Sequence, residues 1–165
     1  MIKPEQIDTI AERIGSMSEE KQEALIDDLA ELQPALLSYA MSEEAEELGE
    51  NEAEIILFAT TVIWKVFNTN HKNKLEEISD EELDVLQDNN WKALDDRERK
   101  SGQSLADFVE PFYEGYAEPE ILTFIVDVLE EEEDSEDEFN INDTSRVPMF
   151  VMLKSVADAL LKAIK

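Results

Sequence analysis

Apolar residues recur along almost the whole chain at intervals of three and four positions, and no segment alternates convincingly between apolar and polar residues. Intervals of three and four place side chains on one face of an α-helix, whereas alternation is typical of a β-strand. The pattern therefore predicts one compact all-α domain of about six to eight helices over residues 1–165.

The N-terminal part of the chain predicts short helices. One is expected from Pro4 to Ile14, because proline suits an opening turn and isoleucines recur on one face. Ser16–Glu19 has the sequence of a capping box, so a second helix should follow it. Pro34 predicts a break at Gln33, because proline disfavours helix at the residue before it. The second helix should face the core with Leu25, Ile26, Leu29 and Leu32.

Residues 54–67, EIILFATTVIWKVF, are apolar on nearly all sides. A helix of this kind is covered by protein on several sides, so it should form the centre of the fold, with Trp64 and Phe67 in the core. Asn51 is its expected N-terminal cap. The acidic stretch before it should be a linker or short helix that ends at Gly49.

The C-terminal half predicts further amphipathic helices and one acidic loop. Ser79–Glu82 is a second capping box that opens a helix. Residues 130–146 are too acidic to pack and should form a solvated loop. A last helix over residues 147–164 carries an apolar stripe, with Lys154 on the opposite side, and should close the core as a C-terminal cap.

Two segments share a pattern, LAELQPALLSYA at residues 29–40 and LADFVEPFYEGYA at residues 105–117. Each contains a proline before a Tyr-Ala pair, and each precedes an apolar helix. The similarity predicts two stacked pseudo-repeats of a proline-broken helix pair, over about residues 25–67 and 104–130. This arrangement resembles HEAT-like helical repeats in architecture, because their first helix is commonly kinked at a proline. The alternative is chance similarity between amphipathic helices in an irregular up-down helical bundle.

The charge of the chain is large and uneven. There are 42 Asp and Glu residues against 14 Lys and Arg residues, which gives a net charge of −28. Residues 22–64 contain eleven acidic and no basic residues, and residues 101–145 contain fifteen acidic and no basic residues. Such a charge repels nucleic acid and anionic membrane surfaces. Direct binding to either is not expected, and a basic protein becomes the favoured partner.

The sequence offers little catalytic or metal-binding chemistry. It has no cysteine, a single histidine, His71, and four widely separated glycines that cannot form a phosphate-binding loop. The best acidic register for an EF-hand has Phe139 where the loop requires glycine. We therefore expect no enzymatic activity, no cofactor and no metal. Because no apolar segment resembles a signal peptide or a membrane span, we also expect a cytoplasmic protein.

The leading hypothesis is a non-enzymatic interaction module that presents an acidic surface to a basic protein. Acidic groups steer the encounter and exposed aromatic residues supply affinity. The candidate contacts are Trp91, Tyr39, Tyr116, Glu131, Glu132, Glu133 and Asp134. For the two tyrosines, a packing role with a hydrogen-bonded hydroxyl is the alternative.

The acidic composition is compatible with three alternative hypotheses. A nucleic-acid mimic would occupy the basic groove of a DNA- or RNA-binding protein. A small-ligand binder or enzyme would use a cleft between the two repeats, around the tyrosines. Adaptation to a salt-rich cytoplasm would account for the acidity without any binding role.

Overall fold

The computed structural model spans residues 1–165 and describes residues 1–72, 74–94, 103–130 and 143–165. This described part is helical and holds no β-strand beyond one isolated antiparallel bridge between Leu75 and Ile164. The prediction of a compact all-α domain is confirmed. The helices are α1 Pro4–Gly15, α2 Glu19–Leu32, α3 Pro34–Ala40, α4 Glu43–Leu48, α5 Glu50–Asn70, α6 Asp80–Leu94, α7 Leu105–Val109, η1 Glu110–Tyr113, α8 Pro119–Glu130, η2 Asp143–Ser145 and α9 Arg146–Ala163.

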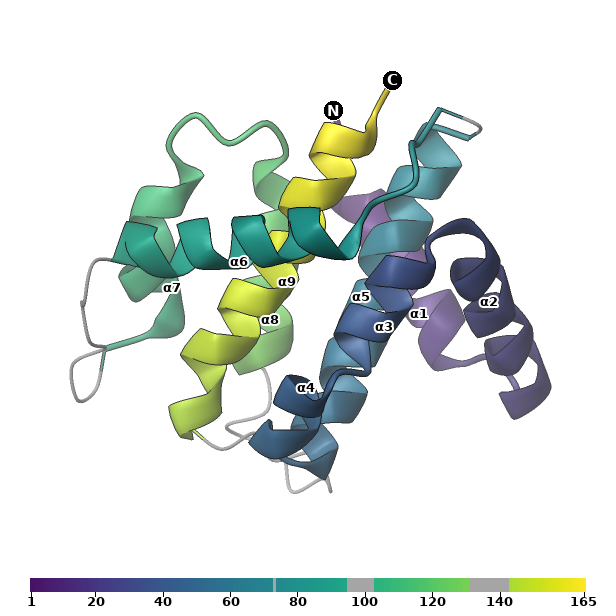
Figure 1. Ribbon diagram of the computed structural model, residues 1–165, viewed down its shortest axis with the longest axis horizontal. Helices are drawn as coiled ribbons and strands as arrows, with labels where there is room; N and C mark the ends of the chain where they lie inside the picture. Colours follow the sequence, from purple (N-terminus) through teal and green to yellow (C-terminus); the bar gives the residue numbers. More distant parts are fainter. Residues whose placement is uncertain (73, 95–102, 131–142) are drawn as a thin grey trace.

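Two long helices, α5 and α9, form the centre of the fold (Figure 1). The central place of α5 agrees with its apolar sequence, and Trp64 and Phe67 are buried as expected. The last helix differs from the expectation of a cap at one end of the core. α9 contacts α5, α6 and α8 and is buried along nearly its whole length, so it lies in the middle of the core.

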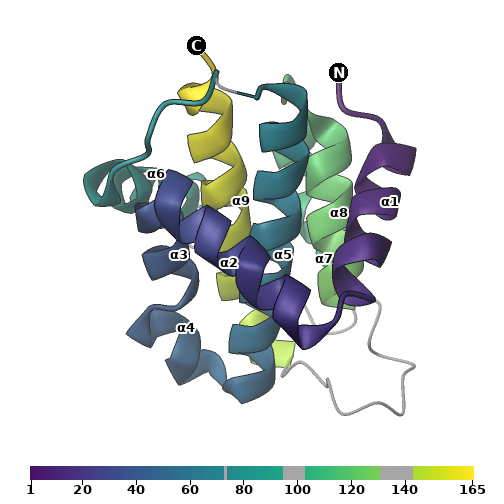
Figure 2. The same ribbon diagram turned by 90° about the vertical axis from the view of Figure 1, so that its right-hand side faces the viewer.

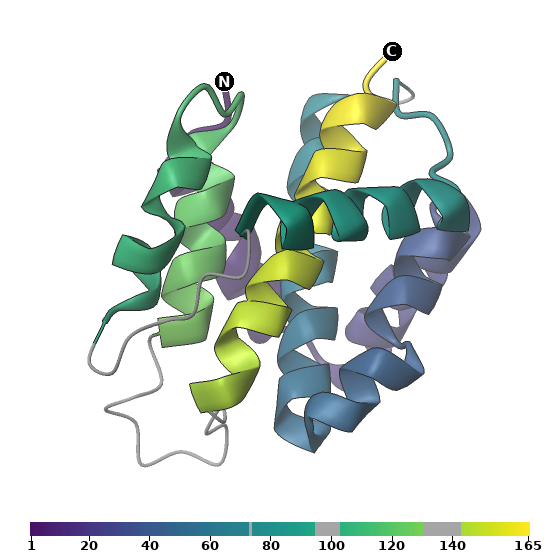
Figure 3. The ribbon, with the colours of Figure 1, turned by 60° about the vertical axis from the view of Figure 1, so that its left-hand side comes forward.

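The other helices are arranged around this pair. Figure 2 shows α9, α5, α8 and α1 as a row of neighbouring helices, with α6 at one side of the molecule and α1 at the other. α6 crosses α9 (Figure 3), and α1 packs against both α5 and α8. The molecule therefore has two distant helical faces, one formed by α6 and the other by α1.

Serine hydroxyls begin several of the helices. Ser18 accepts a hydrogen bond from the backbone amide three residues ahead, at 3.3 Å, and thereby caps α2. Ser79 and Ser104 do the same for α6 and α7. The expected cap at Ser16 is wrong by two residues, because α1 extends to Gly15, the residue before Ser16, and Ser16 donates its hydroxyl hydrogen to the Glu12 carbonyl.

The junction between α4 and α5 depends on Gly49. Its φ of +140° lies in the range that favours glycine. A β-carbon at this position would also collide with the carboxylate of Glu52. α5 begins directly after it, at Glu50, so the expected cap at Asn51 is wrong by two residues.

The predicted break at Gln33 is confirmed, and the side chain at the break joins two distant segments. Gln33 is buried, donates through Nε2 to the Glu76 carbonyl and accepts from the Ile78 amide at Oε1, both at 2.9 Å. Its neighbour Leu32 is half exposed, contrary to the expected inward position. The α2–α3 break thus fixes the segment that leads into α6.

The two segments with the shared proline pattern fold into elements of different length. In the first, the 14-residue helix α2 precedes α3. In the second, the five-residue helix α7 precedes the 3₁₀ helix η1. The apolar helices that follow, α5 and α8, both pack against α9. The duplication and its likeness to HEAT-like repeats stay predictions.

Candidate partner-binding surface

Trp91 lies on the exposed side of α6, with 40 % of its surface accessible. Figure 2 places α6 far from α1, so this tryptophan belongs to a different face from the grooves that α1 borders. Its exposure leaves it available to a partner, and its role as an anchor stays a prediction. The predicted acidic contacts Glu131, Glu132, Glu133 and Asp134 lie outside the described residues.

The hydroxyls of Tyr39 and Tyr116 are engaged inside the protein. Tyr39 on α3 donates to Oε1 of Gln87 on α6. Tyr116 donates to Oδ1 of Asp158 on α9 at 2.7 Å. Burial raises the pKa of both phenols, and the charge of Asp158 raises that of Tyr116 further, while a hydrogen bond with Ser155 acts in the opposite direction on Tyr39. Both side chains therefore pack in the neutral form.

A buried polar cluster joins α6 to α9. Lys154 is only 8 % exposed, contrary to its expected place on the solvent side of the last helix. Its Nζ contacts Oδ1 of Asn90 at 2.8 Å and Oδ2 of Asp158 at 2.9 Å. The Asn90 amide donates to Ser155 and to Asp158, at 3.0 Å in each case. This network explains why a helix with a lysine and an aspartate can be buried.

Aromatic rings complete the surroundings of the lysine. Its Nζ lies 5.0 Å from the ring centroid of Phe112 and 5.3 Å from that of Tyr116, within the range of cation–π attraction. The sequence contained one usable signal, because Lys154 and Asp158 are four residues apart on one helix face. None of the three grooves beside α1 is lined by a residue of this cluster.

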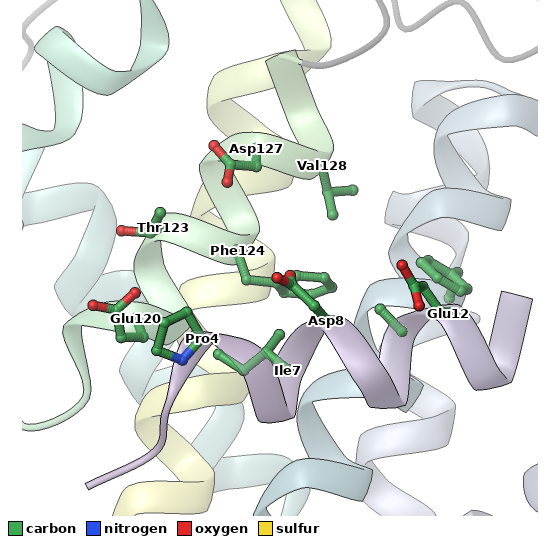
Figure 4. A pocket seen from close by; sticks show the side chains of 11 residues that line it. Pro4, Ile7, Asp8, Glu12, Glu120, Thr123, Phe124, Asp127 and Val128 are labelled. Atoms are coloured by element: carbon green, nitrogen blue, oxygen red, sulfur yellow. The ribbon is translucent and has the colours of Figure 1, made fainter.

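A groove with an acidic rim lies between α1 and α8 on the other side of the molecule (Figure 4). It has a volume of about 340 Å³ and is open to solvent. Figure 4 labels Asp8, on α1, and Phe124, on α8, among the residues that line it. The apolar residues that line it are Ile7, Ala11, Phe58, Phe124 and Val128. The acidic residues that line it, which define the acid-rimmed groove, are Asp8, Glu12, Glu120 and Asp127.

Helix spacing explains how the rim forms. Asp8 and Glu12 are four residues apart on α1, and Glu120 and Asp127 are seven apart on α8, so each pair shares one helix face. A hydrogen bond of 2.8 Å from the Ile2 amide to the Glu118 carboxylate holds the start of α1 beside the start of α8. Among the described residues that line it there is no lysine or arginine, so this part of the groove concentrates negative charge over an apolar floor.

A second groove, the apolar groove, lies between α1, α2 and α5. It has a volume of about 620 Å³ and is also open to solvent. Half-buried apolar side chains such as Ile26 and Leu57 line it, and Glu54 is the one acidic residue among the described residues that line it. Phe58 lines both grooves, so they meet at this ring. Sequence reasoning placed Ile26 in the core and missed both grooves, because they depend on the packing of α1 against distant helices.

Metal and histidine sites find no support in the described residues. No cluster of three or more histidine, cysteine or acidic side chains there has the geometry to hold a metal ion. His71, the one histidine of the sequence, is half-buried and stacks on Phe67 at the end of α5, with ring centroids 6.4 Å apart.

Neither a membrane-spanning helix nor a similarity to known proteins points to a functional class for this chain. Within the described ranges, no helix has both the length and the apolar character needed to cross a membrane. A scan against protein-family models and searches of curated proteins and of solved structures give no match to this chain.

Proposed function

We propose that this protein is a non-enzymatic interaction module that binds a basic protein, and that the acid-rimmed groove between α1 and α8 receives the partner. The observation that carries the proposal is the pairing of four carboxylates with an apolar floor in one solvent-open groove. Neither part alone would suffice, because exposed ion pairs contribute only about 0–1 kcal/mol each and scattered apolar residues are common on protein surfaces.

The two parts have different physical roles. Carboxylates on the two sides of the groove repel one another, and cationic side chains of a partner would relieve that repulsion and speed the encounter. The floor, which includes Phe58 and Phe124, would lose its contact with water on binding and so supply affinity. The open shape favours a protein segment over a small ligand, because small-molecule sites usually bury most of their ligand.

The proposal is tested by site-specific photo-crosslinking in lysate of the source organism. A photo-reactive amino acid replaces Thr123, an exposed residue in the acid-rimmed groove, or Val85, an exposed residue on α6. We expect the probe at Thr123 to capture a basic protein that the probe at Val85 does not capture. Capture should weaken as salt rises, because salt screens the exposed carboxylates.

Charge-neutral variants make this test specific. Asp8→Asn combined with Asp127→Asn should reduce capture at Thr123, whereas Asp84→Asn on α6 should not. Equal capture at both probe positions, or no dependence on the rim carboxylates, would refute the proposal. Competition of the captured protein by DNA or RNA would instead favour the nucleic-acid mimic.

A further inference from the structure

The acid-rimmed groove and the apolar groove form one continuous surface at the end of α1. Phe58 lines both. Gly15, the last residue of α1, lies beside this ring: a β-carbon added there would stand 4.0 Å from Cε1 of Phe58. Apart from its chain neighbours and its own helix backbone, it would meet no other atom of the described residues within 4 Å. The absence of a side chain at Gly15 therefore leaves room above Phe58 for an occupant to pass from one groove to the other.

The chemistry of the surface changes along its length. On the α8 side, carboxylates of Asp8, Glu12, Glu120 and Asp127 surround the floor. On the α2 side, the lining is mostly aliphatic, with Leu25, Ile26, Ile55 and Leu57 among its residues. An occupant that complements both parts must carry cationic and apolar side chains together.

The helices that line the surface favour a helical occupant over an extended peptide. α1, α2, α5 and α8 pair their backbone groups internally, and the described part of the chain has no strand edge along the grooves. An extended peptide would find no backbone partners on such walls, whereas a helix satisfies its own amides and carbonyls. A groove lined by helices with apolar side chains is the usual receptor for an amphipathic helix.

Charge excludes a second copy of this chain as the favoured occupant. The protein has a net charge of −28, and the rim carboxylates would face a partner of the same sign. Juxtaposed like charges oppose association. The complement of this surface is a segment with lysine or arginine residues.

We infer that the occupant is an amphipathic cationic α-helix of the partner, which lies over the acid-rimmed groove and extends past Phe58 into the apolar groove. This inference rests on the proposed function and adds the form of the bound segment. The partner's basic residues face Asp8, Glu12, Glu120 and Asp127, and its apolar residues contact the floor on both sides of Gly15.

Two synthetic peptides of about 18 residues test the inference, since shorter isolated helices are marginal in water. Both contain the same leucines and lysines, but only one arranges them as an amphipathic helix; the other has an order that gives no apolar face. Isothermal titration calorimetry measures the affinity of each for the full chain. We expect the amphipathic peptide to bind at least about tenfold more tightly, with a gain in helical circular dichroism.

Steric variants locate the binding site. Gly15→Leu fills the space above Phe58 without a demand for unusual backbone geometry, because Gly15 is not in the left-handed region. Ser16→Leu adds the same side chain at the next, exposed position, which does not line either groove. Gly15→Leu should weaken the amphipathic peptide about tenfold, and Ser16→Leu should not. Amide chemical shifts provide a measurement without mutation, with changes expected at Thr61 and Thr123 and not along α6.

Charge reversal separates this inference from the proposed function. The rim variant Asp8→Lys with Asp127→Lys should abolish binding of both peptides. If it does so while the two peptides bind the unmodified protein equally, the helical occupant is wrong and the basic partner stands. If charge reversal leaves both affinities unchanged, both proposals fail. Equal effects of Gly15→Leu and Ser16→Leu would overturn the path across Phe58.

Discussion

The α6–α9 face and the α1–α8 face use charged side chains in opposite ways. Between α6 and α9, Lys154 and Asp158 are largely removed from water and are paired with each other and with Asn90. Between α1 and α8, Asp8 and Asp127 are exposed at the rim of a groove. Charges of the first kind hold helices together, because a buried charge without its partner is strongly destabilising, whereas charges of the second kind lie at a solvent-exposed rim.

The comparison separates stability from binding. Substitutions at the buried cluster should change the free energy of unfolding, and substitutions at the acidic rim should change affinity for a basic partner and leave stability nearly unaltered. Three measurements, in order of decreasing effect, test whether the buried cluster and the acidic rim differ in this way.

The largest effect is expected from Lys154→Met. The methionine leaves the Asp158 carboxylate buried without its cation and removes the donor to Asn90, so we expect a loss of about 3 kcal/mol in the free energy of unfolding. Urea denaturation followed by circular dichroism measures it. Lys162→Met, an exposed lysine two turns further along α9, is the matched control. Similar losses for the two variants would show that the buried cluster does not stabilise the fold.

An intermediate effect is expected at alkaline pH. The pKa values of Tyr39 and Tyr116 are raised in the folded state above an ordinary value near 10. The unfolded chain therefore loses these protons first, so stability is intact below about pH 10 and falls as pH rises further, by up to about 1.4 kcal/mol per pH unit for each tyrosine.

Phenylalanine variants isolate this contribution from that of the lysines. Urea denaturation between about pH 8 and 11 should show a shallower decline for Tyr39→Phe and for Tyr116→Phe than for the unmodified protein. Tyr113→Phe is the comparison: burial also raises the pKa of Tyr113, but this side chain is less buried and bonds to Thr123 in an exposed position, so its removal should change the slope less. An unchanged slope in the first two variants would contradict internal packing of the neutral phenols.

The smallest effect is expected at the acidic rim. Asp8→Asn with Asp127→Asn should alter the free energy of unfolding by no more than about 0.5 kcal/mol, as is usual for surface substitutions. Thermal and urea denaturation at low salt measure it, with Asp84→Asn as a control on α6. A loss of more than about 1 kcal/mol, which is twice the usual surface range, would show that the rim is part of the scaffold.

Local features of the fold could be predicted from the sequence, because they depend on residues close together in the chain. Pro34 located the break at Gln33, and Ser79 marked the start of α6. The prediction of a cap at Ser16 was wrong because Ser18 offers the same hydroxyl two residues later. α1 continues to Gly15, so Ser16 ends α1 and Ser18 caps α2. Periodicity identified the apolar stripe of α9 but assigned Lys154 to solvent, since a lysine normally is exposed and its partner Asn90 is 64 positions away.

The candidate site was predictable only in its composition. The excess of acidic residues indicated a basic partner, and Ile26 was recognised as apolar. The grooves arise because α1 lies beside α8, more than 100 residues further along the chain, as the contact from Ile2 to Glu118 shows. Neither helix carries a sequence signal for the other, so the arrangement of Asp8 and Asp127 around one floor required the structure.

The buried amide of Gln33 has a consequence for how the chain is made. It holds the backbone of Glu76 and Ile78 on one side, while on the other side the Glu76 amide donates to the Ala163 carbonyl and Leu75 pairs with Ile164. When the ribosome has synthesised residues 74–78, Gln33 is already present, but Ala163 and Ile164 are not yet made. Native pairing of residues 74–78 can be completed only after residues 163–165 have emerged, so this segment finishes folding after the translation of α9.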